Sequence, residues 1–181
     1  MKVTHTELEG LIIIEPEFHG DERGYFIESF NRRNWQNAII NAPDFVQDNE
    51  SCSTLNVLRG LHFQAPPYEQ GKLVRVVKGK VLDVAVDIRK KSPTYGKHFK
   101  AILSGENKKQ IYIPPGFAHG FLTLEDQTIF SYKCTSYYNK ESEGGILWKD
   151  DSLGINWGTN KPIVSDKDAV LPKFNKFVSP F

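Results

Sequence analysis

Hydrophobic and polar residues alternate with a period of two from the N-terminus almost to residue 150, and Gly, Pro, Asn and Asp interrupt the alternation often. This pattern is typical of short β-strands joined by turns. It predicts strands over residues 11–15, 24–29, 73–77, 81–88, 99–103, 110–113, 119–123 and 128–136. Because helices do not alternate with these strands, we expect an all-β, double-sheet jelly roll with a few short helices. Residues 81–88 are nearly all apolar, which indicates a central strand covered on both faces.

Two short segments have helical features. Asn31 is placed to cap a helix whose apolar residues share one face: Trp35, Ala38 and Ile39. Ser165 is placed to cap a second helix, in which Asp168 occupies the capping-box position. The chain after Pro172 shows neither the period of two of a strand nor the spacing of a helix, so we expect a loose extension there.

Length and charge narrow the possible classes of protein. A chain of 181 residues predicts one domain, over residues 1–181, with a core large enough to fold without disulfides or structural metals. Its 23 basic and 22 acidic residues indicate no general attraction to nucleic acid or to a membrane. The N-terminus has no signal-peptide pattern and no apolar run approaches the ~20 residues of a membrane span, so we expect a cytoplasmic protein. Cys52 and Cys134 form no metal-binding or disulfide pattern.

Two histidines stand in segments that need no polar residue for their own stability. His62 is set among apolar residues of VLRGLHFQ, residues 57–64, and a hydrogen-bonded core histidine is the simpler interpretation. His119 ends a Pro-x-Gly-x-x-His turn that resembles the second motif of the cupin superfamily. In metal-binding cupins the first motif supplies a His-x-His pair, but here that place reads His62-Phe63-Gln64. Because transition-metal sites normally take three or more side-chain ligands, a barrel without metal that uses histidine as a base is the better interpretation.

A tyrosine is the third candidate. Alternation over residues 128–136 places Tyr132 on the same strand face as its apolar neighbours Phe130 and Cys134. Tyr132 therefore points into the barrel or out of it together with them. Core packing with a satisfied hydroxyl and a catalytic role both remain open from the pattern alone.

Eight motifs in order along almost the whole chain resemble one enzyme family. They are DERGYF (21–26), QDN (47–49), VLRGLHFQ (57–64), QGKLVRV (70–76), DVAVD (83–87), IPPGFAHGF (113–121), YK (132–133) and GILW (145–148). They are similar to the dTDP-4-dehydrorhamnose 3,5-epimerase family. The resemblance implies a homodimeric cupin that uses no metal and no cofactor.

The family's reaction, in dTDP-L-rhamnose biosynthesis, inverts C3 and C5 of dTDP-4-dehydro-6-deoxy-D-glucose to give dTDP-4-dehydro-L-rhamnose. The related alternative is an epimerase that acts at one carbon of a similar nucleotide 4-ketosugar. A cupin metalloenzyme and a sugar-nucleotide binding module without activity are the alternatives from other classes. Both epimerised carbons lie next to the C4 ketone, so the reaction needs a base, a proton donor on the opposite face and cations near the carbonyl oxygen.

The resemblance also implies a role for individual residues. His62 would be the base, oriented by Asp168; Tyr132 would be the acid; Lys72, with Arg59, would stabilise the enolate. Asp83 would support a second pair with His119, for which a purely structural role is equally open. The residues expected to bind substrate are Arg23, Phe26, Glu28, Gln47, Asn49, Arg59, His119, Glu143 and Lys167.

Three of the expected binding residues belong to the N-terminal part of the chain. In the family this part crosses to the partner subunit, so Arg23, Phe26 and Glu28 are expected to serve the neighbouring site. Tyr137 is a candidate for stacking on the thymine ring, with packing as the alternative. The sequence departs from the commonest family pattern at residues 50–53 and 55–56, which replaces no catalytic residue.

Overall fold

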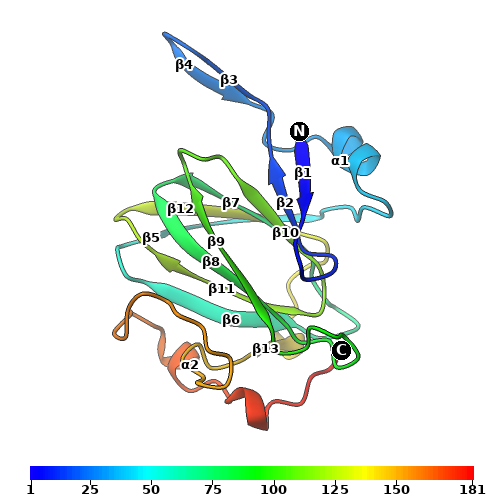
Figure 1. The fold of residues 1–181 in the computed structure, drawn as a ribbon, viewed down its shortest axis with the longest axis vertical. Coiled ribbons are helices and arrows are strands. Elements are labelled where there is room, and N and C mark those ends of the chain that lie inside the picture. Colours follow the sequence, from blue (N-terminus) through cyan, green and yellow to red (C-terminus); the bar gives the residue numbers. More distant parts are fainter.

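Two antiparallel β-sheets stacked face to face form the body of the molecule. The computed structural model describes residues 1–181 (Figure 1). The six-stranded sheet has the order β1 (Lys2–His5), β2 (Ile12–Glu15), β10 (Gln110–Ile113), β7 (Lys72–Lys78), β12 (Thr128–Cys134), β5 (Gln47–Ser53). The five-stranded sheet has the order β13 (Glu143–Gly145), β6 (Leu58–Gln64), β11 (Phe117–Thr123), β8 (Lys80–Asp87), β9 (His98–Ser104). The predicted all-β, double-sheet class is confirmed.

Every segment predicted to be a strand contains one, whereas β1, β3, β5, β6 and β13 were not among the predicted strands. The reason differs between them. The β5 sequence QDNESCS is polar and lies at a sheet edge, so it shows no hydrophobic alternation. β6, with the sequence LRGLHFQ, places Arg59, His62 and Gln64 among its apolar residues without a strict alternation, so it has no clear period of two.

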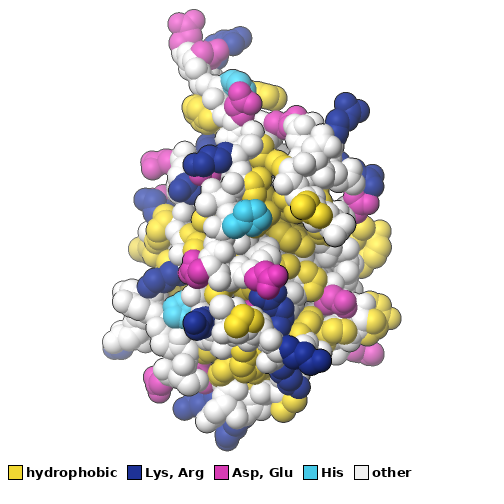
Figure 2. Space-filling model, turned by 45° about the vertical axis from the view of Figure 1, so that its right-hand side comes forward, with side chains coloured by type: hydrophobic (Ala, Val, Ile, Leu, Met, Phe, Trp, Pro, Cys, Tyr) yellow, Lys and Arg dark blue, Asp and Glu magenta, His cyan; other side chains and the backbone are white.

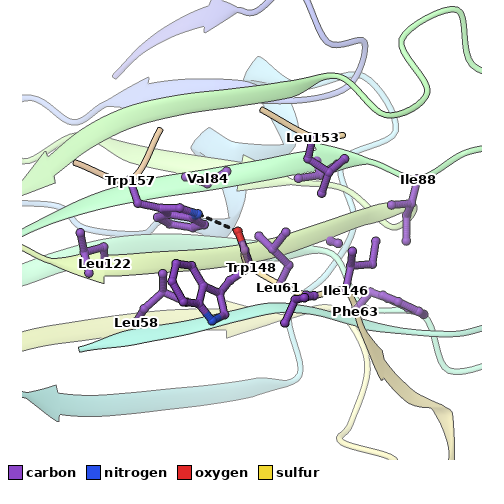
Figure 3. Close-up of a cluster of buried hydrophobic side chains, with 13 residues drawn as sticks. Leu58, Leu61, Phe63, Val84, Ile88, Leu122, Ile146, Trp148, Leu153 and Trp157 are labelled. Atoms are coloured by element: carbon purple, nitrogen blue, oxygen red, sulfur yellow. Dashed lines mark hydrogen bonds between the residues drawn. The ribbon is translucent and has the colours of Figure 1, made fainter. Parts of the chain in front are cut away.

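Apolar side chains on the two faces of β8 belong to different clusters, as expected for a central strand. Val81 and Ala85 point between the two sheets and pack with residues of β7, β11 and β12. Val84 and Val86 point to the other side of the five-stranded sheet, where a second cluster contains Trp148. Figure 3 shows this second cluster, in which the indole Nε1 of Trp157 donates a hydrogen bond of 2.9 Å to the carbonyl oxygen of Trp148.

The helix α1 (Arg32–Ala38) covers the outer face of the six-stranded sheet. Asn31 caps it, as predicted, by accepting a hydrogen bond from the backbone N–H of Asn34. Trp35 is 2% exposed and packs on Ile12, Ile14, Leu73 and Tyr112. Ala38 is exposed, so the predicted three-residue apolar face is wrong at that position. Because the helix has only seven residues, one large buried side chain, Trp35, attaches it to the sheet.

The chain after Pro172 is not the loose extension that was predicted. It contains the 3-10 helix η2 (Phe174–Lys176) and packs three aromatic rings against the Trp148 cluster: Phe174, Phe177 and Phe181. The hydroxyl of buried Ser179 donates to the carbonyl oxygen of Ile88, and the N–H of Lys90 donates to the carbonyl oxygen of Phe181. An irregular backbone has no hydrophobic period, which is why the sequence pattern does not reveal this packing.

A two-stranded hairpin, which we call the arm, projects from the body. It consists of β3 (Phe18–Asp21) and β4 (Gly24–Ile27), which pair only with each other. Figures 1 and 2 show it rising from one end of the molecule, with acidic and basic side chains at its tip and hydrophobic ones nearer the body. Phe26 is 68% exposed. The helices of the structure are too short and too polar for any of them to cross a membrane.

The docked C-terminal segment leads to a stability prediction. Phe177→Ala removes a ring that packs edge to face on Phe63, with ring centroids 5.4 Å apart, and should lower the free energy of unfolding by about 2 kcal/mol. Val178→Ala is the matched control, because Val178 is 79% exposed, and should change it by less than about 0.5 kcal/mol. Urea denaturation measures both; equal effects would contradict the packing role.

Candidate active site

A cavity of about 510 Å³ opens at one end of the space between the two sheets. That volume suits a small-molecule ligand. Seven of the residues singled out in the sequence line it: Arg59, His62, Lys72, His119, Tyr132, Lys167 and Asp168. They come from β6, β7, β11, β12 and the helix α2 (Asp166–Ala169), so the fold gathers side chains that are distant in sequence.

His62 and Asp168 form a close pair at the wall of this cavity. The distance from His62 Nε2 to Asp168 Oδ1 is 2.6 Å, and the backbone N–H of Gly60 donates to the other carboxylate oxygen at 3.2 Å. Ser165 caps α2 as predicted, by accepting from the N–H of Asp168. The Asp168 carboxylate does not complete a capping box, because both of its oxygens are engaged by β6.

The pKa of Asp168 lies below its usual value. Burial acts to raise it, but the hydrogen bond and charge of His62, the Gly60 N–H and the charge of Lys167 outweigh burial. The carboxyl group is thus held as an anion beside the imidazole.

Two glycines, Gly60 and Gly120, allow β6 and β11 to approach closely where the Gly60 N–H binds Asp168. A Cβ added to Gly60, whose φ is +130°, would lie 2.5 Å from the Cα of Gly120 on β11, and one added to Gly120 would lie 2.7 Å from the carbonyl oxygen of Arg59. The β6–β11 register shifts between His119 and Phe121. Larger side chains would force the two strands apart at this crossing.

Tyr132 reaches the cavity from the opposite sheet. Its strand neighbours Thr128, Phe130 and Cys134 are all buried, so the predicted common face points inward. Burial is the main reason that the pKa of the Tyr132 phenol is raised, with the nearby Cys134 and Glu143 adding to the effect against Arg59. Tyr132 therefore keeps its proton at neutral pH.

Lys72 also lies in the cavity, at the start of β7. Burial lowers the pKa of its amine, and the partial opposition of Cys134, Glu143 and Asp83 does not cancel the effect. No carboxylate lies within ion-pair distance of its Nζ, so this cation remains available to an anionic group of a ligand.

The second histidine pair is more deeply buried than the first. His119 Nε2 lies 2.8 Å from Asp83 Oδ2, and both residues are less than a tenth exposed. The ring centroid of Phe130 is 6.1 Å from that of His119 and 6.1 Å from that of Tyr132. His119 and His62 are directly opposite each other on neighbouring strands. His119 thus lines the same cavity as His62, and Asp83 lies behind it.

The other predicted binding residues form the rim or lie outside the cavity. Lys167 Nζ pairs with Glu143 at 2.5 Å, and the hydroxyl of Tyr138 donates to Glu143 at 3.0 Å. Gln47 donates to Asn49, which in turn donates to the sulfur of Cys134.

Arg23, Phe26 and Glu28 do not reach the cavity of their own chain. Arg23 pairs with Asp21 at the tip of the arm, and Glu28 accepts hydrogen bonds from Asn31 and Asn34.

Sequence reasoning missed Ser53 and the backbone of Gly60. The hydroxyl of Ser53 accepts from Nε and Nη2 of Arg59, at 3.2 and 3.1 Å, and so fixes the guanidinium at the cavity. A serine in a polar edge strand carries no signal of this role. No group of three or more His, Cys, Asp or Glu side chains is placed to hold a metal ion.

Comparison with known proteins agrees with this geometry. Residues 5–176 match the family model described as dTDP-4-dehydrorhamnose 3,5-epimerase. The chain belongs to the dTDP-4-dehydrorhamnose 3,5-epimerase family. It is 54% identical to the dTDP-4-dehydrorhamnose 3,5-epimerase of Shigella flexneri over 96% of both chains.

Two solved structures show the same fold. A dTDP-6-deoxy-D-glucose-3,5-epimerase from Legionella pneumophila, in complex with dTDP-4-keto-L-rhamnose, has a TM-score of 0.94 at 48% identity and covers 98% of this chain and 94% of its own. A 3'-monoepimerase from Streptomyces bikiniensis, in complex with dTDP-quinovose, has a TM-score of 0.87 at 33% identity and covers 93% and 85%.

The lowered pKa of Asp168 predicts a pH-dependent contribution to stability. The ionised carboxyl should stabilise the folded state above its usual pKa of 3.8, and this stabilisation should disappear as the pH falls through the lower folded-state pKa. Asp168→Asn should therefore be clearly less stable than the wild type at about pH 6, with a smaller difference at about pH 3. Urea unfolding at both pH values measures this difference.

Asp166→Asn is the matched control, since Asp166 is exposed on the same helix and makes no ion pair. Its effect should be small at both pH values. A constant deficit of the Asp168 variant across the whole range would show that ionisation of the carboxyl group does not contribute to stability.

Proposed function

We propose that this cavity epimerises C3 and C5 of dTDP-4-dehydro-6-deoxy-D-glucose, giving dTDP-4-dehydro-L-rhamnose for dTDP-L-rhamnose biosynthesis. The observation that carries the proposal is that His62, held by Asp168, and a protonated Tyr132 line one cavity from opposite sheets. Inversion needs this arrangement, because the proton must leave from one face of the sugar and return on the other.

His62 acts as the base. Its Nε2 carries a proton and donates it in a hydrogen bond to Asp168, which leaves Nδ1 to accept the proton of C3 or C5. The Asp168 carboxylate then stabilises the imidazolium that forms. Proton removal leaves an enolate whose charge rests on the oxygen of C4, where the unpaired ammonium of Lys72 and the guanidinium of Arg59 stabilise it.

Tyr132 acts as the acid. Its phenol gives a proton to the carbanion face opposite His62, which completes the inversion at that carbon. Each inversion leaves one extra proton on His62 and one too few on Tyr132, so exchange with water restores both groups. His119 binds the substrate beside His62, and buried Asp83 holds its ring in place.

We also infer that two copies associate and exchange arms. Arg23, Phe26 and Glu28 lie away from their own cavity, and the arm that carries them projects with its aromatic side chains exposed. In the partner's site the Arg23 guanidinium would bind diphosphate oxygens in its forked geometry. At the rim, the nucleotide sugar contacts four further residues: Gln47, Asn49, Glu143 and Lys167.

We also propose that the protein is located in the cytoplasm, and cell fractionation checks this location.

Turnover in deuterated water tests the number of centres. The wild-type enzyme should place deuterium at both C3 and C5 of the product, since each proton is replaced from solvent-exchanged groups. NMR of the isolated sugar nucleotide measures both positions. Label at C3 alone would instead support the one-centre reaction, which the likeness to the 3'-monoepimerase keeps as the second candidate.

Two variants serve as controls for this labelling. His62→Ala should lower turnover by about 100-fold or more and abolish labelling, because the base is lost. Tyr132→Phe should also lower turnover severely but still exchange the C3 proton from the His62 face without inversion. Thermal midpoints near the wild-type value for both variants exclude unfolding as the cause.

Complementation tests the exchange of arms. Arg23→Ala and His62→Ala should each be inactive alone, but a mixed dimer would combine an intact cavity from one subunit with an intact arm from the other. With random pairing after co-expression, about half of the dimers are mixed and each mixed dimer has one complete site out of two. About one quarter of the wild-type activity should therefore be restored. If each arm serves its own chain, or the protein is a monomer, mixing would restore nothing.

A further inference from the structure

Three glutamine side chains fix a backbone segment at the rim of the cavity. Residues 135–139, between β12 and the 3-10 helix η1 (Lys140–Ser142), form no helix or strand. The carbonyl oxygen of Ser136 accepts from Gln70 Nε2 at 2.7 Å, and the N–H of Tyr138 donates to Gln47 Oε1 at 2.9 Å. Gln64 binds two further backbone groups of the same segment. We call Gln47, Gln64 and Gln70 the glutamine clamp.

Gln64 is the centre of the clamp. Its Nε2 donates to the carbonyl oxygens of Tyr68 and, at 3.0 Å, Tyr137, while its Oε1 accepts from the N–H of Asn139 at 2.9 Å. The side chain is 4% exposed. It therefore joins the loop that follows β6 to the segment that follows β12. Because both amide hydrogens are used and the residue does not line the cavity, Gln64 has no means of acting on the substrate directly.

The clamped segment presents two aromatic side chains to solvent. Tyr137 is 70% exposed and Tyr138 is 57% exposed, although the carbonyl oxygen of Tyr137 and the N–H of Tyr138 are both held by glutamine side chains. Tyr138 donates to Glu143, Glu143 pairs with Lys167, and Lys167 lines the cavity. The exposed rings thus continue the rim of the site on the side of α2.

We propose that Gln64 and Gln70 are positioning residues which hold residues 136–139 rigid, so that the exposed rings of Tyr137 and Tyr138 are preorganised before the nucleotide binds. This inference rests on the proposed function and on the sequence-based expectation that an aromatic residue of this segment stacks on the thymine ring; its new element is the role of the two glutamines. A flat aromatic surface binds a base by stacking. Fixing the rings before binding avoids the entropic cost of ordering them afterwards, so the clamp sets affinity and not the chemical step.

Gln64→Met tests the proposal. Methionine keeps the length of the side chain and removes all three hydrogen bonds without leaving a cavity. We expect KM for the sugar nucleotide and Kd for dTDP to rise by about tenfold, with kcat within about twofold of the wild type. Hydrogen exchange should become faster at the amide of Asn139. Gln70→Met, which removes one hydrogen bond, should give a smaller rise of the same kind.

Asn107→Leu is the matched control. Asn107 also makes three side-chain hydrogen bonds to backbone groups, in the turn between β9 and β10, away from the cavity. It should leave KM, kcat and Kd for dTDP unchanged. An equal rise in KM for this variant would show that the effect is general loosening of the fold.

The outcomes separate the clamp from the proposed reaction. Unchanged Kd for dTDP in both glutamine variants, with a wild type that epimerises, would overturn the clamp alone. A wild type that binds dTDP without epimerising would overturn the reaction, while the clamp would still be judged by the Kd of its variants. If Gln64→Met fails to fold, Gln70→Met decides: a raised Kd supports the clamp and an unchanged one refutes it. A lower kcat at unchanged KM would contradict a role in binding.

Discussion

The close crossing of β6 and β11 at Gly60 and Gly120 is the constraint on which the site depends. There is no room for a Cβ at either position, and the approach leaves the Gly60 N–H free to bind Asp168. Asp168 belongs to a four-residue helix that could not hold a carboxylate in place by itself. Its orientation comes from β6, which supplies both the N–H of Gly60 and the imidazole of His62. The docked C-terminal aromatic residues support this wall from the far side of the same sheet.

The electrostatic environment sorts the groups of one cavity into different protonation states. Asp168 is kept ionised by hydrogen bonds and neighbouring positive charge, whereas Tyr132 is kept protonated chiefly by burial. Burial also lowers the pKa of Lys72, and no carboxylate is paired with its amine. An anion, an acid and an unpaired cation thus coexist within one small volume, which is the set that enolate chemistry needs.

Much of this could be predicted from the sequence, although not by periodicity alone. Alternation was sufficient for the double-sheet class and placed Tyr132 on one face with Phe130 and Cys134, but it left open whether that face points inward. The family resemblance connected His62 to Asp168, which lies 106 positions further along the chain. Polar β5 and the irregular chain after Pro172 carry no period, so neither the edge strand nor the packing of Phe177 was visible. Ser53 meets Arg59 across two strands, and Gln64 meets two loops, so both sets of contacts depend on the folded chain and no local pattern records them.

The core and the rim support the predicted site residues in different ways. His62 and Tyr132 stand on strands whose neighbours are buried, so their positions follow from the core. Glu143 lies at the start of the edge strand β13, and its side chain is held by Tyr138 and Lys167. Arg23 lies on the arm, whose two strands pair only with each other. If the proposed function is correct, a change in the rim therefore alters how a nucleotide is held before it alters how a proton moves. A 3,5-epimerase and a 3'-monoepimerase both share this barrel, so the barrel alone does not decide how many centres are epimerised.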